Sequence, residues 1–347
     1  MRLSGNEETS YWAGGYKNLW LNGVLFMNGG IPAKEKSPKR SRSVPRAAAA
    51  AVVRHWQLYA MLVLPLAFVV VFHYMVYPNL RIAFMNYRPA RGWNSDWVGF
   101  GTFQKVFRDA DFHRAFRNTL VFNLVDILVN FPAPILLALM LNELRLMKFK
   151  RVSQTILYLP HFLSSVIVAS VAYTLFRPST GLVNVALMNM GVISKGIPFL
   201  TEKWHWVTTY LSINIWQQVG WGSIIYLATI MSIDPSLYEA ATVDGAGRFK
   251  RLWHITFPGI RPTIVLLLIM RMGQLLGSGF ERLNAFGNVN VREFQYQLSI
   301  YIYEKGLGPA GDFSRATAVG LFQTLVGLFM VFAADRAAKL LGEDGLI

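Results

Sequence analysis

The segment that decides the fold of this 347-residue chain reads Asp234-Pro-Ser-Leu-Tyr-Glu-Ala-Ala-Thr-Val-Asp-Gly-Ala-Gly-Arg-Phe-Lys-Arg-Leu-Trp-His-Ile-Thr-Phe-Pro258. It is polar, whereas the segments on both sides of it, 205–231 and 262–279, are apolar and long enough to cross a membrane. A loop that joins two membrane spans lies on one side of the membrane. The sequence therefore indicates a helical membrane protein with a structured polar loop at residues 232–261.

Local signals divide this loop into two short helices. Asp234 can accept hydrogen bonds from the first free backbone N–H groups, and Pro235 fits the first helical turn, where its missing N–H is harmless. Gly245 can adopt the left-handed conformation that ends a helix. A second helix is predicted to begin near Arg248 and to stop before Pro258, because a residue that precedes proline avoids the helical conformation.

Each of the two short helices carries an apolar face. In the first helix, Leu237, Ala240 and Ala241 share this face. In the second helix, the face is predicted to contain Phe249, Leu252, Trp253 and Thr256, while the cations point to water, lipid headgroups or a partner. The loop is therefore predicted to be a docking element, although a hairpin that only rests on the membrane surface would show the same pattern.

Composition places the chain among membrane proteins. Its residues are 53% hydrophobic and only 15% charged, and the charges are gathered in connecting segments. About six membrane helices are predicted, at 57–77, 119–141, 152–176, 205–231, 262–279 and 316–334. The predicted fold class is therefore all-α and polytopic, with a basic N-terminal tail at 1–54, a membrane domain at 55–335 and a short C-terminal tail at 336–347.

The distribution of Lys and Arg predicts the orientation of these helices. Cytoplasmic segments are richer in Lys and Arg than the opposite segments. In this chain the excess falls on the side of the N-terminal tail, the short basic loop 142–151 and the loop 232–261. Both termini are therefore expected in the cytoplasm. Much of the basic charge behind the net charge of +15 lies in loops beside apolar spans, so membrane lipid and not nucleic acid is the expected partner of the basic segments.

The sequence carries no sign of an enzyme. It has no cysteine, and its six histidines form no i, i+4 pair, so a metal site is not expected. It contains no Gly-x-x-x-x-Gly-Lys-Ser/Thr motif for nucleotide phosphates. Gly306-Leu-Gly-Pro-Ala-Gly311 matches the dinucleotide pattern, but no strand and helix frame it. We expect neither catalytic residues nor a cofactor in this chain.

The spacing within the loop resembles the EAA signature of ABC importer permeases. Glu239-Ala240-Ala241 is followed by Gly245 after three residues and by Ile255 after nine more. Phe257 then precedes Pro258, where the family usually has Leu. Further segments resemble the carbohydrate-import branch, especially its polysaccharide-type permeases: Asn142-Glu143, Tyr158-Leu-Pro-His-Phe-Leu-Ser164 and Leu237-Tyr-Glu-Ala-Ala-Thr-Val-Asp-Gly-Ala-Gly247.

This resemblance implies a type I ABC importer permease fold and a set of partner subunits. The loop between the fourth and fifth helices would form coupling helices that dock on a cytoplasmic ATPase, through Glu239, Ala240, Ala241, Asp244, Gly245, Ile255 and Pro258. ATP and magnesium would bind to two ATPase subunits and not to this chain. A second permease, expected to be a related but different chain, and an extracytoplasmic solute-binding protein would complete an importer of the bacterial inner membrane.

Polar residues inside the predicted spans should line the substrate path, because they are unfavourable against lipid. Arg271 is the first candidate, with Gln274 and Ser278 about one and two helical turns beyond it. The other candidates are Asn214, Trp216, Gln217 and Trp221 of the fourth span and Gln323 of the sixth. Alternatively, such residues hold helices together.

Two features of the sequence bear on that alternative. Asp126 of the second predicted span is a candidate partner for Arg271. Gly273 and Gly277 form a G-x-x-x-G pattern, which is more typical of a close helix contact than of a pore.

The cargo is the part of the function that the sequence determines least. The predicted extracytoplasmic segments carry a net positive charge, which together with Arg271 favours an anionic ligand such as a uronic-acid oligosaccharide. An alginate-type importer is therefore our first hypothesis. The alternatives are a neutral oligosaccharide, a permease for amino acids, peptides or phosphate, and a membrane scaffold or sensor without transport.

Overall fold

The structure is a computed structural model that describes residues 54–277, 279–309, 311–343 and 345–346. The chain divides into two compact units, 1–70 and 71–347, and each is described by itself. Apart from Arg54, the predicted N-terminal tail lies outside the described residues, as does Ser278. The described part of the first unit is formed by the apolar helix α2 (Trp56–Val69).

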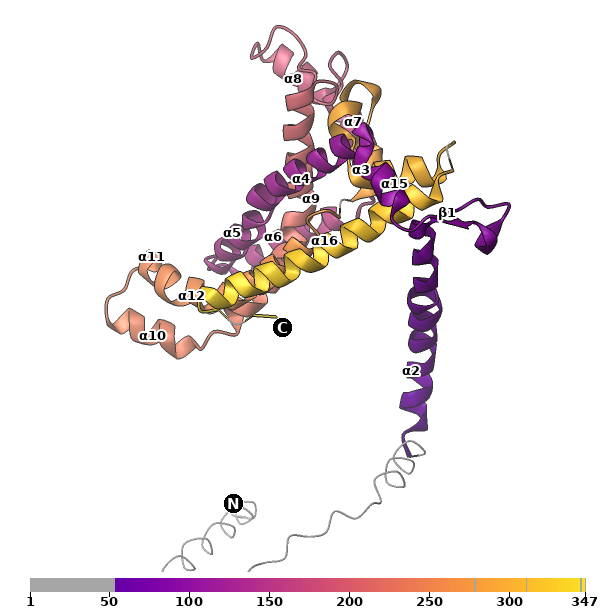
Figure 1. Cartoon of the computed structure of the whole chain (residues 1–347). Coiled ribbons are helices and arrows are strands. Elements are labelled where there is room, and N and C mark those ends of the chain that lie inside the picture. Colours follow the sequence, from indigo (N-terminus) through magenta and orange to yellow (C-terminus); the bar gives the residue numbers. More distant parts are fainter. Residues whose placement is uncertain (1–53, 278, 310, 344, 347) are drawn as a thin grey trace, which may run out of the picture. The chain divides into compact units, whose positions relative to one another are not determined.

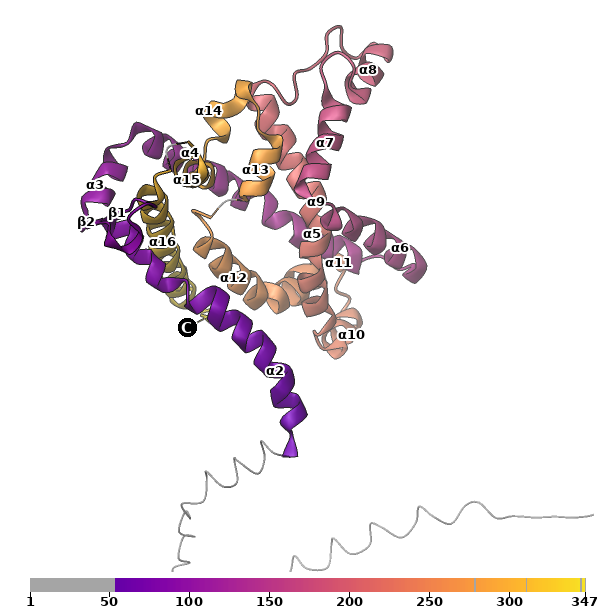
Figure 2. The same cartoon turned by 90° about the vertical axis from the view of Figure 1, so that its right-hand side faces the viewer.

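The second unit consists almost entirely of helices (Figures 1 and 2). Before the polar loop they are η1 (Val70–Tyr74, which begins at the last residue of the first unit), η2 (Tyr77–Phe84), η3 (Gly92–Asn94), α3 (Gly101–Arg108), α4 (Ala110–Asn130), α5 (Pro132–Asn142), α6 (Met147–Tyr158), η4 (Leu159–Phe162), α7 (Ser165–Phe176), α8 (Leu182–Asn189) and α9 (Lys203–Met231). From the loop onward they are α10 (Pro235–Val243), α11 (Arg248–Arg251), η5 (Leu252–Thr256), α12 (Phe257–Gly273), α13 (Phe280–Phe286), η6 (Val289–Val291), α14 (Arg292–Gln295), α15 (Leu298–Leu307) and α16 (Phe313–Leu340). The all-α prediction is confirmed, apart from a short antiparallel pair of β1 (Met85–Asn86) and β2 (Asp96–Trp97).

Four helical stretches among the described residues are long and apolar enough to cross a membrane: Trp56–Phe84, Ala110–Asn142, Arg248–Gly273 and Phe313–Leu340. They coincide with the first, second, fifth and sixth predicted spans. The third prediction corresponds to a broken span, whose two parts, Met147–Phe162 and Ser165–Phe176, are bent by 101°. The fourth predicted span is present as the 29-residue helix α9. It is not one of the four apolar stretches because its Asn, Gln and Trp residues lower its mean hydropathy.

Helix α9 organises the second unit. It packs against α4, α5, α6 and α12. Figures 1 and 2 both show α8 at one end of this unit and α10 at the other. The segment formed by α10, the turn after it, α11 and the π turn η5 is called the hairpin from here on.

Two buried apolar clusters pack along α9, and polar residues separate them. The larger cluster contains Trp206 and Tyr210 from the first part of α9, and the smaller one contains Tyr226 and Ile230 from its last part. The stretch between them includes Asn214, which is buried although it is polar. Hence the centre of α9 must satisfy polar groups inside the protein.

The fifth predicted span is wrong at its C-terminal end, because α12 stops at Gly273. At this point α12 and α16 approach closely: a Cβ added to Gly327 would lie only 2.5 Å from the carbonyl oxygen of Gly273. Gly273 therefore makes the close helix contact that the G-x-x-x-G pattern predicts, whereas Gly277 lies beyond the helix.

After α12 the backbone unwinds, and amide side chains from two other helices bond to its carbonyl groups. Asn123 of α4 donates to the carbonyl oxygen of Leu275 (2.6 Å), and Gln323 of α16 donates to that of Leu276 (2.8 Å). Non-helical backbone at membrane depth is stable only where neighbouring groups satisfy it in this way.

The predicted stop before Pro258 is also wrong. The chain continues as one helical stretch from Arg248 to Gly273, through a π turn at Leu252–Thr256. Pro258 then lies in the first turn of α12, where a missing N–H is tolerated. The π turn is a single wider turn inside this helical stretch, and it ends two residues before Pro258. Likewise, α16 extends to Leu340, past the predicted end of the sixth span at Ala334.

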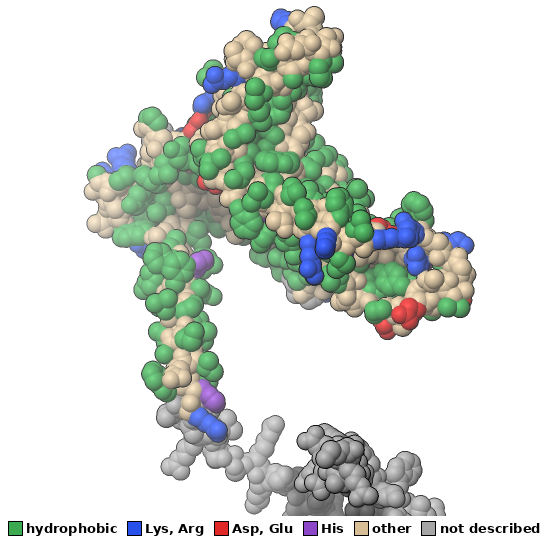
Figure 3. All heavy atoms as spheres, turned by 180° about the vertical axis from the view of Figure 1, so that it is seen from behind, with side chains coloured by type: hydrophobic (Ala, Val, Ile, Leu, Met, Phe, Trp, Pro, Cys, Tyr) green, Lys and Arg blue, Asp and Glu red, His purple; other side chains and the backbone are tan. Residues whose placement is uncertain are grey.

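Apolar side chains cover much of the surface seen in Figure 3. Among the exposed apolar side chains of the second unit, wherever they lie on its surface, are Leu128, Leu136 and Phe329, each more than half exposed. A soluble protein rarely exposes so many large apolar side chains. This surface fits a chain that is surrounded by lipid and by other membrane subunits.

Candidate functional site

The first helix of the hairpin has the end signals that the sequence predicts. The Asp234 carboxylate accepts a hydrogen bond from the backbone N–H of Ser236 (2.9 Å), and this backbone bond, together with the Ser236 hydroxyl, holds the pKa of Asp234 below its usual value. Gly245 has φ +73°, and beside it the N–H of Ala246 donates to the carbonyl oxygen of Ala241 (2.8 Å). This is the left-handed turn expected for glycine at the end of a helix.

Side-chain hydrogen bonds tie the two arms of the hairpin together. The hydroxyl groups of Tyr238 and Thr256 lie 2.9 Å apart, and Arg251 donates to the hydroxyl oxygen of Thr242 (2.9 Å). Thr242 in turn donates to the carbonyl oxygen of Tyr238 (2.6 Å). These bonds fix α10 against the segment that leads into α12.

Large apolar side chains on the hairpin point away from the protein. Val243 and Phe249 are 89% and 88% exposed, and Leu237 and Trp253 are also more than half exposed. The predicted common face of the second helix is wrong in one position, because Thr256 is buried. The π turn changes the helical period there, so Thr256 turns toward the protein while Trp253 stays outside.

The predicted coupling residues all lie on this hairpin or at its base. Exposed positions are Glu239, Ala240, Asp244, Gly245 and Pro258, and partly buried ones are Ala241 and Ile255. In Figure 3 the end of the second unit that carries the hairpin is on the right, and both basic and acidic side chains are exposed there. The hairpin thus offers an apolar surface with charges beside it, as a protein-docking surface requires.

The second site is a polar cavity of about 750 Å³ formed mainly by α4, α9, α12 and α13. Four of the predicted path residues line it: Asn214, Trp221, Arg271 and Gln274. Gln274 was predicted to lie one helical turn beyond Arg271. It lines the cavity from the unwound segment after α12 instead. Trp216, Gln217 and Gln323 do not line this cavity, and Ser278 lies outside the described residues. Their place in a substrate path remains a prediction.

Arg271 and Asp126 form an ion pair in the cavity wall, which confirms the partner expected from the sequence. The Asp126 side chain is only 8% exposed, and it also accepts hydrogen bonds from Asn130 and from Asn214 (2.8 Å to the latter). A buried carboxylate needs such partners because it has lost its water. Arg271 is 41% exposed on its cavity side. The charge of Arg271 is therefore balanced within the protein.

Arg282 of α13 is a cavity residue that the sequence did not reveal. Its guanidinium donates to the side-chain oxygens of Asn214 and of Gln217, the latter at 3.0 Å. Prediction failed here because α13 was expected to be part of an extracytoplasmic loop. Only the position of a cation just after an apolar span could have suggested it. The structure thus places two arginines, Arg271 and Arg282, on one cavity.

The break in the third span borders the same cavity. Gln217 donates to the free carbonyl oxygen of Leu163 at the break (2.8 Å), and the Ser164 hydroxyl caps α7. Just before the break, the His161 ring stacks on Trp221, with ring centroids 4.6 Å apart and planes within 3°. Gln217 therefore serves the broken backbone on one side and Arg282 on the other, and Trp221 lies flat against the histidine.

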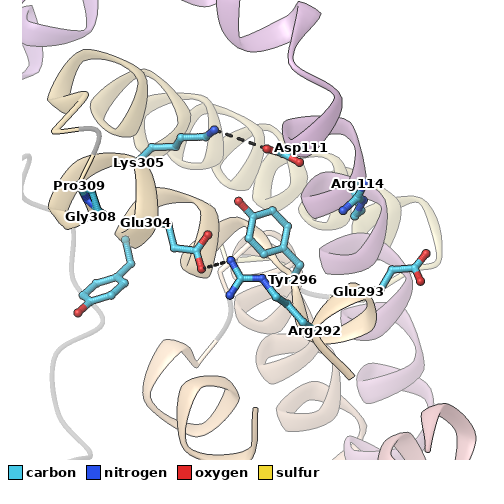
Figure 4. A pocket seen from close by; sticks show the side chains of 10 residues that line it. Asp111, Arg114, Arg292, Glu293, Tyr296, Glu304, Lys305, Gly308 and Pro309 are labelled. Carbon is cyan, nitrogen blue, oxygen red and sulfur yellow. Dashed lines mark hydrogen bonds and ion pairs between the residues drawn. The ribbon is translucent and has the colours of Figure 1, made fainter. Parts of the chain in front are cut away.

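A second hollow, of about 930 Å³, lies among α4, α14 and α15 (Figure 4). Charges of both signs line it in equal number, and four of them form ion pairs: Arg292 with Glu304 (2.7 Å) and Lys305 with Asp111 (3.6 Å). Paired charges leave little net potential for an ionic ligand.

Asp109, next to this hollow, joins three helices. It caps α4, accepts a hydrogen bond from the Tyr301 hydroxyl (2.9 Å) and lies 3.6 Å from both Lys305 and Arg315. Burial by itself would raise the pKa of Asp109, but the Tyr301 hydroxyl, the N–H of Asp111 and the two cations together lower it below 3.8. The ionised carboxylate therefore stabilises this junction at neutral pH.

Within the described residues, no three His, Asp or Glu side chains lie close enough together to hold a metal ion. The two candidate sites are a docking hairpin and a polar cavity. Together with the apolar surface they define a polytopic membrane protein of the transport class.

The chain belongs to the family described as "Binding-protein-dependent transport system inner membrane component", which matches residues 112–342. It is 40% identical, over 312 residues, to the polygalacturonan/rhamnogalacturonan transport system permease protein YteP of Bacillus subtilis (strain 168), covering 90% of this chain and 95% of that protein. The family assignment makes the chain a transport component of the inner membrane.

Two crystal structures have a similar fold. One is a bacterial ABC transporter involved in the import of the acidic polysaccharide alginate (TM-score 0.75, 40% identity, covering 84% of this chain and 98% of that one). The other is a bacterial alginate ABC transporter in complex with an alginate pentasaccharide-bound periplasmic protein (TM-score 0.76, 39% identity, covering 86% and 99%). The likeness confirms the type I importer permease fold expected from the loop spacing.

Proposed function

We propose that the chain is one of the two permease subunits of an ATP-driven importer for oligosaccharides, and that its cargo is acidic, such as alginate or polygalacturonan oligomers. The observation that carries this proposal is the pairing of an exposed apolar hairpin with a polar cavity in one helical unit. The first fits a motor subunit, and the second fits a hydrophilic solute. The sugar permeases among the relatives support the substrate class.

In this proposal the hairpin docks on a cytoplasmic ATPase, and Glu239 lies on its exposed side. ATP and magnesium bind to the two ATPase subunits, whose closure moves the hairpin. The hydrogen bond between Tyr238 and Thr256 passes that motion to α12, and α12 carries Arg271 of the cavity. Both termini then lie in the cytoplasm, as the distribution of Lys and Arg predicts.

The end of the second unit that carries α8 faces outward in this arrangement. A solute-binding protein delivers the sugar there, and a second, related permease supplies the other wall of the path. One related transporter has been crystallised with a periplasmic protein, which supports this partner. Import alternates between an outward-open and an inward-open cavity, without covalent chemistry on this chain.

Uptake by living cells tests the proposal. A strain that lacks this chain should lose the uptake of labelled alginate pentasaccharide or trigalacturonate, and the wild-type chain should restore it. Affinity purification of the tagged chain should recover an ATPase subunit and a second permease. Unchanged uptake of acidic and neutral oligosaccharides in the deletion strain would overturn the carbohydrate assignment. Recovery of the chain without any ATPase would overturn the importer assignment.

A further inference from the structure

The two cavity arginines differ in how their charges are balanced. Arg271 pairs with the carboxylate of Asp126. Arg282, in contrast, forms side-chain hydrogen bonds only with neutral groups within the described part of the chain, namely the amide oxygens of Asn214 and Gln217 and the hydroxyl group of Tyr210. A guanidinium stays charged in proteins. Arg282 therefore brings one positive charge into the cavity that no carboxylate contacts.

A hydrogen-bond chain connects the two arginines and fixes this difference. Asn214 accepts from Arg282 and donates to Asp126, which holds Arg271. Asp126 accepts from Asn130, Asn214 and Arg271, and it forms no ion pair with Arg282 within the described residues. The amide of Asn214 thus lies between Asp126, which balances the charge of Arg271, and Arg282, which has no carboxylate partner.

Two residues that line the cavity have unused hydrogen-bonding groups. The Nε of Arg282 is buried and has no hydrogen-bond partner among the described residues. Gln297 also borders the cavity, is 1% exposed, and leaves both polar atoms of its amide without a partner. Buried donors without partners are unfavourable, so a ligand oxygen that reaches them is bound more tightly.

Glu281 is the acidic group that could cancel the charge of Arg282. It borders the cavity, but it also lines a neighbouring hollow and its side chain is exposed. It forms no ion pair with Arg282 in the structure as described. An exposed carboxylate is screened by solvent, so it balances a cavity charge only weakly.

We infer that Arg282 is the specificity-determining residue of this cavity, which binds a carboxylate group of an acidic oligosaccharide, while Arg271 is a positioning residue held by Asp126. This inference rests on the proposed function. It assigns recognition of the anion to α13 and not to the arginine inside the span. A uronate carboxylate can accept two parallel hydrogen bonds from a guanidinium, and neutral sugars lack this group.

The test compares two probes in the complete importer reconstituted with its ATPase and its binding protein. They are alginate pentasaccharide and its methyl-esterified form, which has the same length but no charge. In Arg282→Gln, the ratio of acidic to esterified uptake should fall about ten- to hundredfold, as expected for loss of a charged hydrogen bond. Arg282→Lys should restore most of the ratio, because it keeps the charge.

Two further variants separate recognition from packing. Arg271→Gln should lower the uptake of both probes together, because it leaves Asp126 buried without its cation. Glu281→Gln should keep or raise the acidic preference. Equal loss of both probes in Arg282→Gln would give Arg282 a structural role and overturn the inference. Failure of the wild-type importer to transport either probe would instead overturn the proposed function.

Discussion

The hairpin and the cavity differ in which side chains are exposed and in how far apart in the sequence their hydrogen-bond partners lie. On the hairpin, apolar side chains such as Phe249 and Val243 are exposed, and its hydrogen bonds join residues close in sequence. In the cavity, polar side chains are buried, and the Asp126–Arg271 pair spans 145 positions. The difference teaches that the proposed docking surface depends on local structure, whereas the cavity proposed to hold the cargo depends on how distant helices meet.

Damage to the hairpin should produce the largest effect and leave the cavity intact. Deletion of Ala240–Gly245, or Glu239→Lys, should abolish uptake while the protein stays in the membrane, because the docking surface is lost. Uptake and membrane abundance are the two measurements. The matched control is Glu202→Lys at the other end of α9, another exposed acidic residue, which should retain most of the activity. Normal uptake by Glu239→Lys would contradict the coupling role.

Damage to the cavity should first reduce stability. Asp126→Asn removes the anion that balances Arg271 and should lower the stability of the complex by about 3 kcal/mol, the usual effect of breaking a buried pair. The melting midpoint of the purified importer measures this change. Adding Arg271→Gln to Asp126→Asn should recover part of the loss, because no charge is then left unpaired. If the double variant loses more stability than the two single variants lose together, Asp126 and Arg271 do not stabilise the protein as an ion pair.

The turn of the hairpin offers a comparison of two glycines. A Cβ at either Gly245 or Gly247 would meet no atom within 4 Å, but only Gly245 has a positive φ. Gly245→Ala should therefore destabilise the hairpin by about 1–2 kcal/mol through backbone strain alone. Gly247→Ala should be neutral. Hydrogen exchange at residues 234–256 measures the difference, and equal protection in both variants would remove strain as the explanation.

The smallest expected effect concerns Asp109 and pH. Because its pKa is lowered in the folded protein, its carboxylate stabilises the fold above pH 3.8, and this contribution disappears as the pH falls through the lowered pKa. Asp109→Asn can still cap α4, so it should cost about 1 kcal/mol at pH 7. Melting midpoints of wild type and variant should converge at acidic pH. A constant difference down to pH 3 would mean that the charge is not responsible.

Local signals allowed most of the hairpin to be predicted. The capping by Asp234 and the turn at Gly245 depend on neighbouring residues only, and both are confirmed. The predicted helix end before Pro258 is wrong because the helix continues through a π turn just before the proline. Such a turn has no simple sequence signal. Of the cavity, the sequence predicted the Arg271–Asp126 pair from the rarity of charges inside spans. It missed Arg282, since α13 looks like a loop.

By itself, the sequence determined the helical membrane class, the approximate spans and most of the hairpin's local structure, because apolar length, capping and charge distribution are properties of neighbouring residues. Only the tertiary structure decided where the third and fifth spans break, which amides satisfy the broken backbone, and which arginine is left unbalanced. These outcomes depend on contacts such as Gln217 with Leu163 and Asn214 with Arg282. Their partners lie far apart in the chain, and the folded helices alone bring them together.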